Sequence, residues 1–237
     1  MKKIETLALI ASLLLHIPFA QSAEEKIADQ EEIIRILKKA QNAADQGHKD
    51  SQRAIGKAYE VGMGNYPKDS QKAFFWFFKA AEQGDAESQV EVGIAYKYGD
   101  GVTKNLEEAM GWLIKAEAAG SLQGRFELSL VLVDSRREKV DNNWGISLLN
   151  KNIEAKHAQS YWLMGALLMA GEILEKNENR ALALWQAGYR LGSLAATFEL
   201  GKFYIRNDET FDMGMSMIGL AATRGFSPAI RFLTVSG

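Results

Sequence analysis

The sequence predicts an all-α protein, a right-handed α-solenoid in which helical hairpins stack one after another. The first observation is a regular spacing of small residues, with steps of 37, 36, 36 and 36 between Gly56, Gly93, Ser129, Gly165 and Gly201. Three residues later, Tyr or Leu recurs at the same steps, at Tyr59, Tyr96, Leu132, Leu168 and Tyr204. A period in this range is typical of repeat proteins whose units cannot bury their apolar faces alone.

Helix-capping residues are the second observation. They recur every 36 residues, and the last copy comes three residues early, at Asp69, Asn105, Asp141, Asn177 and Thr210. Such side chains accept a hydrogen bond from a backbone N–H that the helix leaves unpaired, so they mark where the second helix of each hairpin begins. Glycine inside the first helix costs about 0.5–1 kcal/mol relative to alanine, and its recurrence therefore indicates close approach of the paired helix.

One unit carries a recognisable motif. Its residues are Val92-Gly93, Tyr96, Gly99-Asp100-Gly101-Val102, Ala109, Trp112, Lys115-Ala116, Ala119 and Gly120. This pattern resembles the Sel-1-like repeat (SLR) family, a relative of the tetratricopeptide (TPR) repeats, and the resemblance extends over about Gly47 to Gly225. It implies a scaffold that binds other proteins rather than a catalyst, although a fold does not fix a function.

Composition narrows the classes of function. Hydrophobic residues make up 47% of the chain and charged residues 24%, which is typical of a globular protein, and the formal net charge is −2. No basic stripe is available for nucleic acid, so we expect no nucleic-acid partner. The absence of cysteine excludes disulfides, thiolate metal sites, thiol catalysis and a lipid-modified cysteine. Some secreted family members carry a disulfide in each repeat and are linked to penicillin binding, and this chain departs from them.

The N-terminal segment reads as an export signal. Lys2-Lys3 precede an apolar run from Leu7 to Phe19, and Ala20-Gln21-Ser22 offers a cleavage site before Ala23. The apolar run is shorter than the roughly 20 residues that span a bilayer as a helix. We therefore expect a cleaved, periplasmic protein without stable membrane insertion. Secretion from the cell and an uncleaved anchor are the alternatives.

The expected organisation follows the period along one array. It comprises a signal peptide (1–22), an N-terminal capping helix (23–47), five repeats (48–84, 85–120, 121–156, 157–192 and 193–225) and a C-terminal capping helix (226–237). The capping helix at 23–47 could alternatively dock on a partner helix. The third repeat departs most, because a charged run from Asp134 to Val140 replaces the glycine turn and Lys156 replaces the closing glycine. Ordinary sequence drift and a specific contact built at this repeat are both open as explanations of the departure.

The sequence offers no catalytic, cofactor or metal site. His48 and His157 both follow the residue that closes a helix, where polar residues are expected, and no pair of histidines has metal-ligand spacing. Gly62-Met63-Gly64 and Gly99-Asp100-Gly101 are hairpin turns, since no Lys-Ser or Lys-Thr follows at the spacing of a phosphate loop. A pair of carboxylates of the glycosidase kind stays open, because nothing selects one pair among the acidic residues.

Tryptophans and charges suggest where a partner could bind. Four tryptophans fall at apolar registers and are expected in the core, at Trp76, Trp112, Trp162 and Trp185. Trp144 falls at a register that is otherwise charged, which indicates either a contact residue or packing on the altered turn. Solenoids usually bind on the concave face lined by first helices. The candidates there, together with Trp144, are Glu91, Tyr98, Glu127, Asp134, Glu199, Lys202 and Arg206.

The functional hypothesis is a non-enzymatic adaptor in the bacterial envelope, with a basic or amphipathic segment of another protein as ligand. A solvated face explains the same charges equally well. Two alternatives belong to other classes: a cell-wall-active or penicillin-binding enzyme, and a secreted factor that binds a host protein. The oligomeric state stays open.

Overall fold

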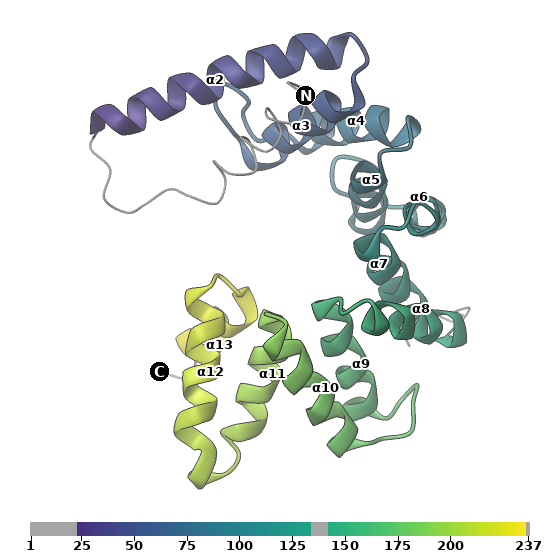
Figure 1. The fold of residues 1–237 in the computed structure, drawn as a ribbon, viewed down its shortest axis with the longest axis vertical. Helices are drawn as coiled ribbons and strands as arrows, with labels where there is room; N and C mark the ends of the chain where they lie inside the picture. The colour runs from purple at the N-terminus through teal and green to yellow at the C-terminus, as the bar shows by residue number, and fades with distance from the viewer. Residues whose placement is uncertain (1–22, 134–141, 236–237) are drawn as a thin grey trace. The chain divides into compact units, whose positions relative to one another are not determined.

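The computed structural model describes residues 23–133 and 142–235, and these residues form helices without any strand (Figure 1). The helices are α2 (Ala23–Asp45), α3 (Lys49–Val61), α4 (Ser70–Glu82), α5 (Ala86–Tyr98), α6 (Leu106–Ala118), α7 (Leu122–Leu132), α8 (Asn142–Glu154), α9 (Ala158–Ala170), α10 (Glu178–Arg190), α11 (Leu194–Tyr204), the 3₁₀ helix η1 (Asp208–Thr210), α12 (Phe211–Thr223) and α13 (Ser227–Val235). The predicted export signal, Asp134 and the Asp141 cap lie outside the described residues.

Consecutive helices pack as hairpins, which confirms the predicted all-α class. α3 packs on α4, α5 on α6, α9 on α10 and α11 on α12, and each hairpin also contacts a helix next to it in the chain. The chain divides into two compact units, Met1–Gly124 and Arg125–Gly237. The division falls within α7, in the repeat that matches the sequence pattern least.

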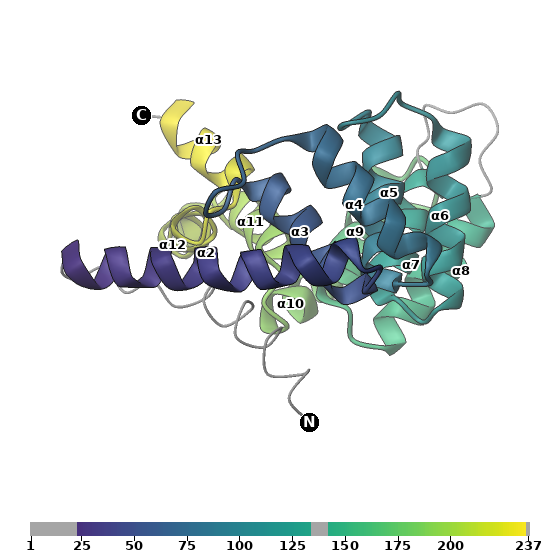
Figure 2. The same cartoon turned by 90° about the horizontal axis from the view of Figure 1, so that it is seen from above.

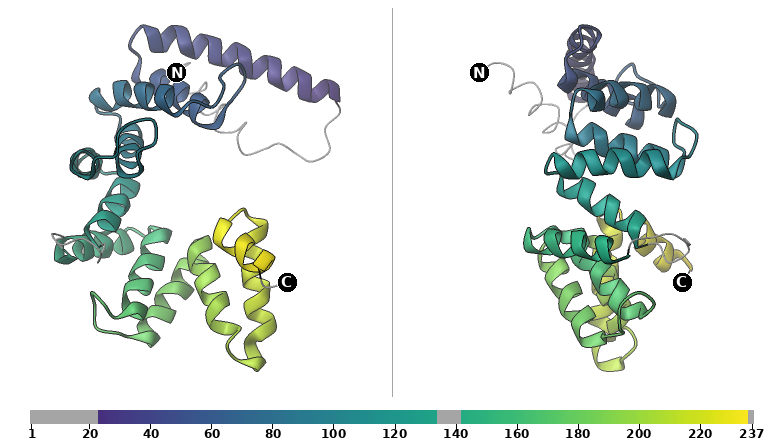
Figure 3. Two further views of the ribbon diagram at one scale, coloured as in Figure 1. Left: turned by 180° about the vertical axis from the view of Figure 1, so that it is seen from behind. Right: turned by 90° about the vertical axis from the view of Figure 1, so that its right-hand side faces the viewer.

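In the first unit, α2 covers one side of α3. Leu37 and Ala44 of α2 are buried in a cluster with Ile55 of α3 and Trp76 of α4. Because α2 has 23 residues and α3 has 13, the N-terminal part of α2 extends past the hairpin (Figure 2). In the second unit, the helices α9 to α12 follow one another as adjacent antiparallel helices, and α13 packs on α12 (Figure 3).

In α3, α5, α9 and α11, the recurring glycine lies against a large side chain of the paired helix. A Cβ placed on Gly93 would lie 2.7 Å from Cγ of Leu113, which is too close for a real contact. A Cβ on Gly165 would likewise meet the indole of Trp185. The same relation holds for Gly56 with Phe77 and for Gly201 with Ile218. The close approach that the period predicts is therefore confirmed.

A second close crossing joins the end of one hairpin to the start of the next. The two residues involved are eight positions apart and small: a Cβ on Gly124 would lie 2.6 Å from Cβ of Ala116, and one on Gly188 would lie 2.9 Å from Cβ of Ala196. The matching pair between α8 and α9 is larger. There the fully buried Asn152 donates from Nδ2 to Oγ of Ser160 over 3.2 Å. A hydrogen bond thus satisfies the buried amide, whereas the α6–α7 and α10–α11 junctions bring small residues together.

The predicted N-caps are confirmed at three of their positions. The side chains of Asp69, Asn105 and Asn177 each accept a hydrogen bond from a backbone N–H in the first turn of the following helix. Their own backbone N–H groups donate to the carbonyls of Tyr59, Tyr96 and Leu168, over 2.9 to 3.0 Å. The capping residue therefore also ties the turn back to the first helix.

Thr210 precedes α12 but does not cap it as predicted. Its hydroxyl donates to the carbonyl of Tyr204 over 2.7 Å and accepts nothing from the helix. The turn of this hairpin is three residues shorter, and Asn207 instead caps the intervening η1. In the longer turns the backbone N–H of the capping residue donates to a carbonyl of the first helix, and here the hydroxyl of Thr210 makes the corresponding bond.

Most second helices end at a glycine with a left-handed backbone. Gly84, Gly120, Gly192 and Gly225 have φ between 77° and 85°, whereas Lys156 holds the same position in the third repeat with φ 58°. Lys156 and Gly192 make the same backbone bond, because each N–H donates to the carbonyl three residues before it. A side chain costs energy in this conformation, so Lys156 is a locally strained closure.

We predict opposite effects for two glycine substitutions in the α5–α6 hairpin. Gly93→Ala should lower the free energy of unfolding by about 1–2 kcal/mol, since overpacking outweighs the better helix propensity of alanine. Gly111→Ala, in the middle of α6 with no atom within 4 Å of a new Cβ, should raise it by about 0.5–1 kcal/mol. Urea unfolding followed by circular dichroism measures both. Equal effects would show that the crossing does not need glycine.

A second matched pair tests the closing turn. Lys156→Gly should raise the free energy of unfolding by about 1 kcal/mol, because glycine adopts positive φ without steric cost. Gly192→Ala should lower it by a similar amount, although nothing lies within 4 Å of the new Cβ, since only its φ of 85° opposes the side chain. The same urea titration measures both changes. A loss of stability in Lys156→Gly would contradict the assignment of strain.

Candidate functional site

The structure places the sequence-predicted contact residues in separate groups. Glu91 and Tyr98 lie on α5 in the first unit. Glu199 and Lys202 lie on α11 in the second unit, and Arg206 follows two residues after that helix. Each group is therefore considered within its own unit.

Two further candidates differ from the expected exposed stripe. Glu127 of α7 is buried, with 9% of its surface exposed, so it is not the solvent-facing residue that its register predicts. A register on one helix cannot show that neighbouring helices cover the same side chain. Trp144, at the start of α8, is 37% exposed, and its role as a contact stays a prediction. Asp134 lies outside the described residues.

The other tryptophans belong to the core, as predicted, although one is less enclosed. Trp76, Trp112 and Trp185 are buried. Trp162 is partly buried, packs against two core clusters, and accepts at its carbonyl a hydrogen bond from Nε1 of Trp185 over 3.1 Å. These four positions shape the interior and leave Trp144 as the exposed member.

The α11 group pairs within itself. Nζ of Lys202 lies 2.9 Å from Oε2 of Glu199 and 5.0 Å from the ring centre of Phe198. Arg206 lies over the ring of Phe203 at 5.8 Å. A partly exposed pair of this kind contributes little to stability, and it leaves no concentrated charge for a partner.

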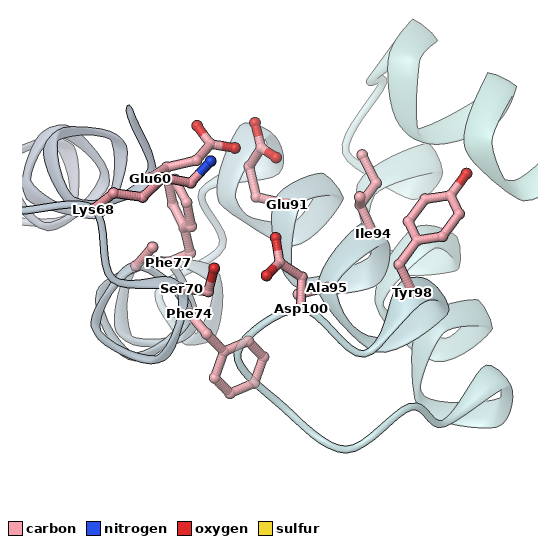
Figure 4. Close-up of a pocket in the computed structure, with 11 residues that line it drawn as sticks. Glu60, Lys68, Ser70, Phe74, Phe77, Glu91, Ile94, Ala95, Tyr98 and Asp100 are labelled. Atoms are coloured by element: carbon pink, nitrogen blue, oxygen red, sulfur yellow. The ribbon is translucent and has the colours of Figure 1, made fainter. Parts of the chain in front are cut away.

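The α5 group lines a hollow of about 390 Å³ in the first unit, which we call the α3–α5 hollow (Figure 4). Its lining comes from the end of α3, the start of α4, α5 and the two adjoining turns: Glu60, Lys68, Ser70, Ala73, Phe74, Phe77, Glu91, Ile94, Ala95, Tyr98 and Asp100. The sequence identified Glu91 and Tyr98. The other residues come from positions that only the packing of successive hairpins brings together.

A tight backbone contact sets one edge of the hollow. Gly101 has φ 71°, and a Cβ on it would overlap the carbonyl of Ser70 at the start of α4. The turn after α5 therefore rests directly on the neighbouring hairpin. This contact holds the preceding residue, Asp100, at the rim, and Figure 4 shows its carboxylate on the same side as that of Glu91.

Aromatic side chains form the apolar part of the hollow. Phe77 is buried, and Phe74 packs edge-on against Tyr96 with ring centres 5.4 Å apart. Tyr98, the last residue of α5, is 67% exposed. The hollow thus has a fixed aromatic base and one large exposed ring at its edge.

Lys57 does not line the hollow, but it forms ion pairs with two glutamates that do. Its Nζ lies 2.5 Å from Oε2 of Glu60 and 3.4 Å from Oε1 of Glu91. Partial burial favours the neutral amine, but the hydrogen bonds and charges of the two glutamates outweigh this effect and raise the pKa of Lys57. Lys57 therefore stays charged and links the first helices of two successive hairpins.

His48 and His157 each stand directly before a helix. His48 and His157 occupy the N-cap positions of α3 and α9, without a capping hydrogen bond from either side chain. Nδ1 of His157 lies 2.9 Å from Oγ of Ser160, and burial lowers the pKa of the imidazole.

Among the residues that the structure describes, no three His, Cys, Asp or Glu side chains gather as a metal site. None of the described helices is long and apolar enough to span a membrane.

Comparison of sequences identifies repeats in this chain. The family model described as Sel1 repeat matches residues 49–85, 86–121 and 158–193. These stretches begin at α3, α5 and α9. They omit the third predicted repeat, whose turn departs from the pattern, and the fifth, whose turn is three residues shorter. A search of curated proteins finds no match.

Solved structures share the fold at low sequence identity. A Sel1 repeat protein from Oxalobacter formigenes is 23% identical, with a TM-score of 0.70 over 88% of this chain and 86% of its own. A protective antigen of uropathogenic Escherichia coli with an SLR fold is 22% identical, with a TM-score of 0.67 over 83% of this chain, which spans only 42% of that protein. An immunity protein from Pseudomonas aeruginosa is 19% identical, with a TM-score of 0.52 over 86% of this chain and 78% of its own.

Proposed function

Because this chain belongs to the Sel1 repeat proteins, which are generally scaffolds for protein interaction, we propose that it is a non-enzymatic scaffold. Its partner is a protein or peptide that binds on the face lined by the first helices of the hairpins. The observation that carries this proposal is Tyr98, a large ring that is 67% exposed beside the α3–α5 hollow.

Tyr98 has the properties of an interface residue. Tyrosine is enriched at the centres of protein interfaces, because its ring supplies contact area at a small entropic cost and its hydroxyl can form a hydrogen bond. Here the ring stands next to a concave surface that contains both apolar and charged groups. An adaptor needs such a surface, and it needs no catalytic constellation.

The location of this scaffold follows from the sequence of the first 22 residues. Lys2-Lys3, the apolar run and the small residues before Ala23 have the order of a secretory signal. We place the mature protein in the periplasm of a bacterial envelope, with release from the cell as the alternative. The partner is then a protein of the same compartment.

Site-specific photo-crosslinking in cells tests the binding face. A photoreactive amino acid at Tyr98 should give an adduct of defined mass with one partner, identified by mass spectrometry. The matched control is Ile114 on α6, a second-helix residue that is 40% exposed and should give no such adduct. Adducts of equal yield at both positions, or at neither, would contradict the assignment of the first-helix face.

Export is tested by the N-terminus of the mature chain. After expression of the full chain in a Gram-negative cell, we expect the periplasmic fraction to contain a protein that begins at Ala23, measured by mass spectrometry. Replacing both lysines of the positive start, Lys2→Glu with Lys3→Glu, should reduce the processed fraction, because the basic end orients the signal at the membrane. A chain that keeps residues 1–22 in the cytoplasm would refute the proposed location.

A further inference from the structure

We propose that the exposed face of α12 is a dimer interface, on which α12 of a second copy of this chain packs antiparallel. Because α12 is the second helix of its hairpin, this surface is not the first-helix face of the proposed function, and neither idea depends on the other. Three observations carry the inference: the scarcity of charge on this face, a spacing of its residues that reads the same in both directions, and opposite charges at the two ends of the helix.

The exposed face of α12 differs in composition from those of the other second helices. α4, α6, α8 and α10 each expose at least two charged side chains, whereas α12 exposes one, Asp212 in its first turn. No residue from Met213 to Thr223 is charged, and Met213 is 48% exposed. A helix that is apolar on every side is typical of a buried element. The open side of α12 is therefore suited to contact a further helix.

Two neighbouring helices cover the rest of α12. α11 and α13 pack on it, and Figure 2, in which α12 is seen end-on, shows them on adjacent sides. Gly214, Ile218 and Ala221 are the buried residues of α12. On the remaining side, nothing lies within 4 Å of a Cβ built on Gly219. This side of α12 thus has room for a partner backbone at close range.

The residues in the middle of the open face have a palindromic spacing. They are Met213, Ser216, Leu220 and Thr223, with steps of 3, 4 and 3. In an antiparallel pair of α12 helices, Met213 of one copy therefore lies level with Thr223 of the other, and Ser216 lies level with Leu220. Large and small residues alternate in this set, so every contact joins a large side chain to a small one. Such contacts let two helices approach closely without overpacking.

The ends of the helix carry opposite charges at matching positions. Asp212 directly precedes the palindromic set and Arg224 directly follows it. Both are exposed, and neither forms an ion pair among the residues that the structure describes. In the antiparallel pair, Asp212 of each copy lies level with Arg224 of the other, which gives two ion pairs related by a two-fold axis. A parallel pair would place Asp212 beside Asp212, where like charges repel.

The size of this contact predicts a reversible dimer. α12 has 13 residues and is therefore about 20 Å long. Interfaces of less than about 1,200 Å² in total are typical of weak, transient complexes. We therefore expect monomer and dimer to exchange, with a proportion of dimer that rises with concentration.

Sedimentation equilibrium of the full chain over a range of concentrations measures the dimer. Ser216→Arg places a long charged side chain against Leu220 of the second copy and should raise the dissociation constant at least about tenfold. The matched control is Ser147→Arg, since Ser147 and Ser216 are both exposed and each is the sixth residue of its helix. The control should leave the constant unchanged. A chain that stays monomeric up to about 1 mM, or an equal effect of the two variants, would overturn the inference.

A charge exchange tests the pairing of the helix ends. Asp212→Arg should weaken the dimer about fivefold to tenfold, because it places an arginine beside Arg224 of the second copy. Adding Arg224→Asp to the same chain restores both ion pairs in reverse and should return the constant to within about twofold of its original value. Both changes oppose the dipole of α12, so circular dichroism first verifies the helix content. A double variant as weak as the single one would contradict the antiparallel pairing.

Introduced cysteines report the register without background, because the chain has no cysteine of its own. Chains with Met213→Cys and chains with Thr223→Cys, distinguished by the mass of a tag, are mixed in equal amounts and oxidised mildly. The heterodimer should exceed the half share of random pairing, since a disulfide needs Cα atoms within about 7 Å. In the homodimer the two cysteines at position 213 would lie about 15 Å apart along the helix axis. A random mixture, or an excess of homodimers, would overturn the antiparallel dimer.

Discussion

The fold depends on one steric constraint, the contact between a glycine of four first helices (α3, α5, α9 and α11) and a large side chain of the helix paired with each. At Gly93 the space that a Cβ would fill belongs to Leu113, and at Gly165 it belongs to Trp185. The two backbones approach closely only because one side of the crossing has no side chain, so the spacing and pairing of the helices follow from these positions. The glycine loses helix propensity at this point, and the contact that it permits offsets the loss.

The candidate site is a consequence of how the hairpins follow one another. The turn after α5 rests on the start of α4 because Gly101 leaves room for the carbonyl of Ser70. That contact carries Asp100 to the rim of the hollow, while the position of α5 sets Glu91 and Tyr98. The short turn of the last hairpin, which Thr210 closes through its hydroxyl, shows that the period tolerates other turns. The turn after α5 joins two helices and also contributes Asp100 to the lining of the hollow.

The sequence predicts the features that each hairpin repeats and misses those that arise between elements. Glycine contacts and the caps at Asp69, Asn105 and Asn177 follow from local rules, so their spacing was sufficient to find them. The burial of Glu127 depends on the surroundings of α7, which no register on one helix contains. The hollow likewise combines residues up to 40 positions apart, from Glu60 to Asp100, and two of its eleven lining residues were identified. The other lining residues come together only through the packing of successive hairpins.

Lys57 connects the stability of the scaffold with the chemistry of the hollow. It neutralises part of the charge of Glu60 and Glu91, and the hydrogen bonds and charges of these glutamates outweigh its partial burial and raise its pKa. Without this ammonium, two carboxylates from successive first helices would face each other across the junction and repel. The ion pairs of Lys57 therefore hold two successive hairpins together at the edge of the hollow.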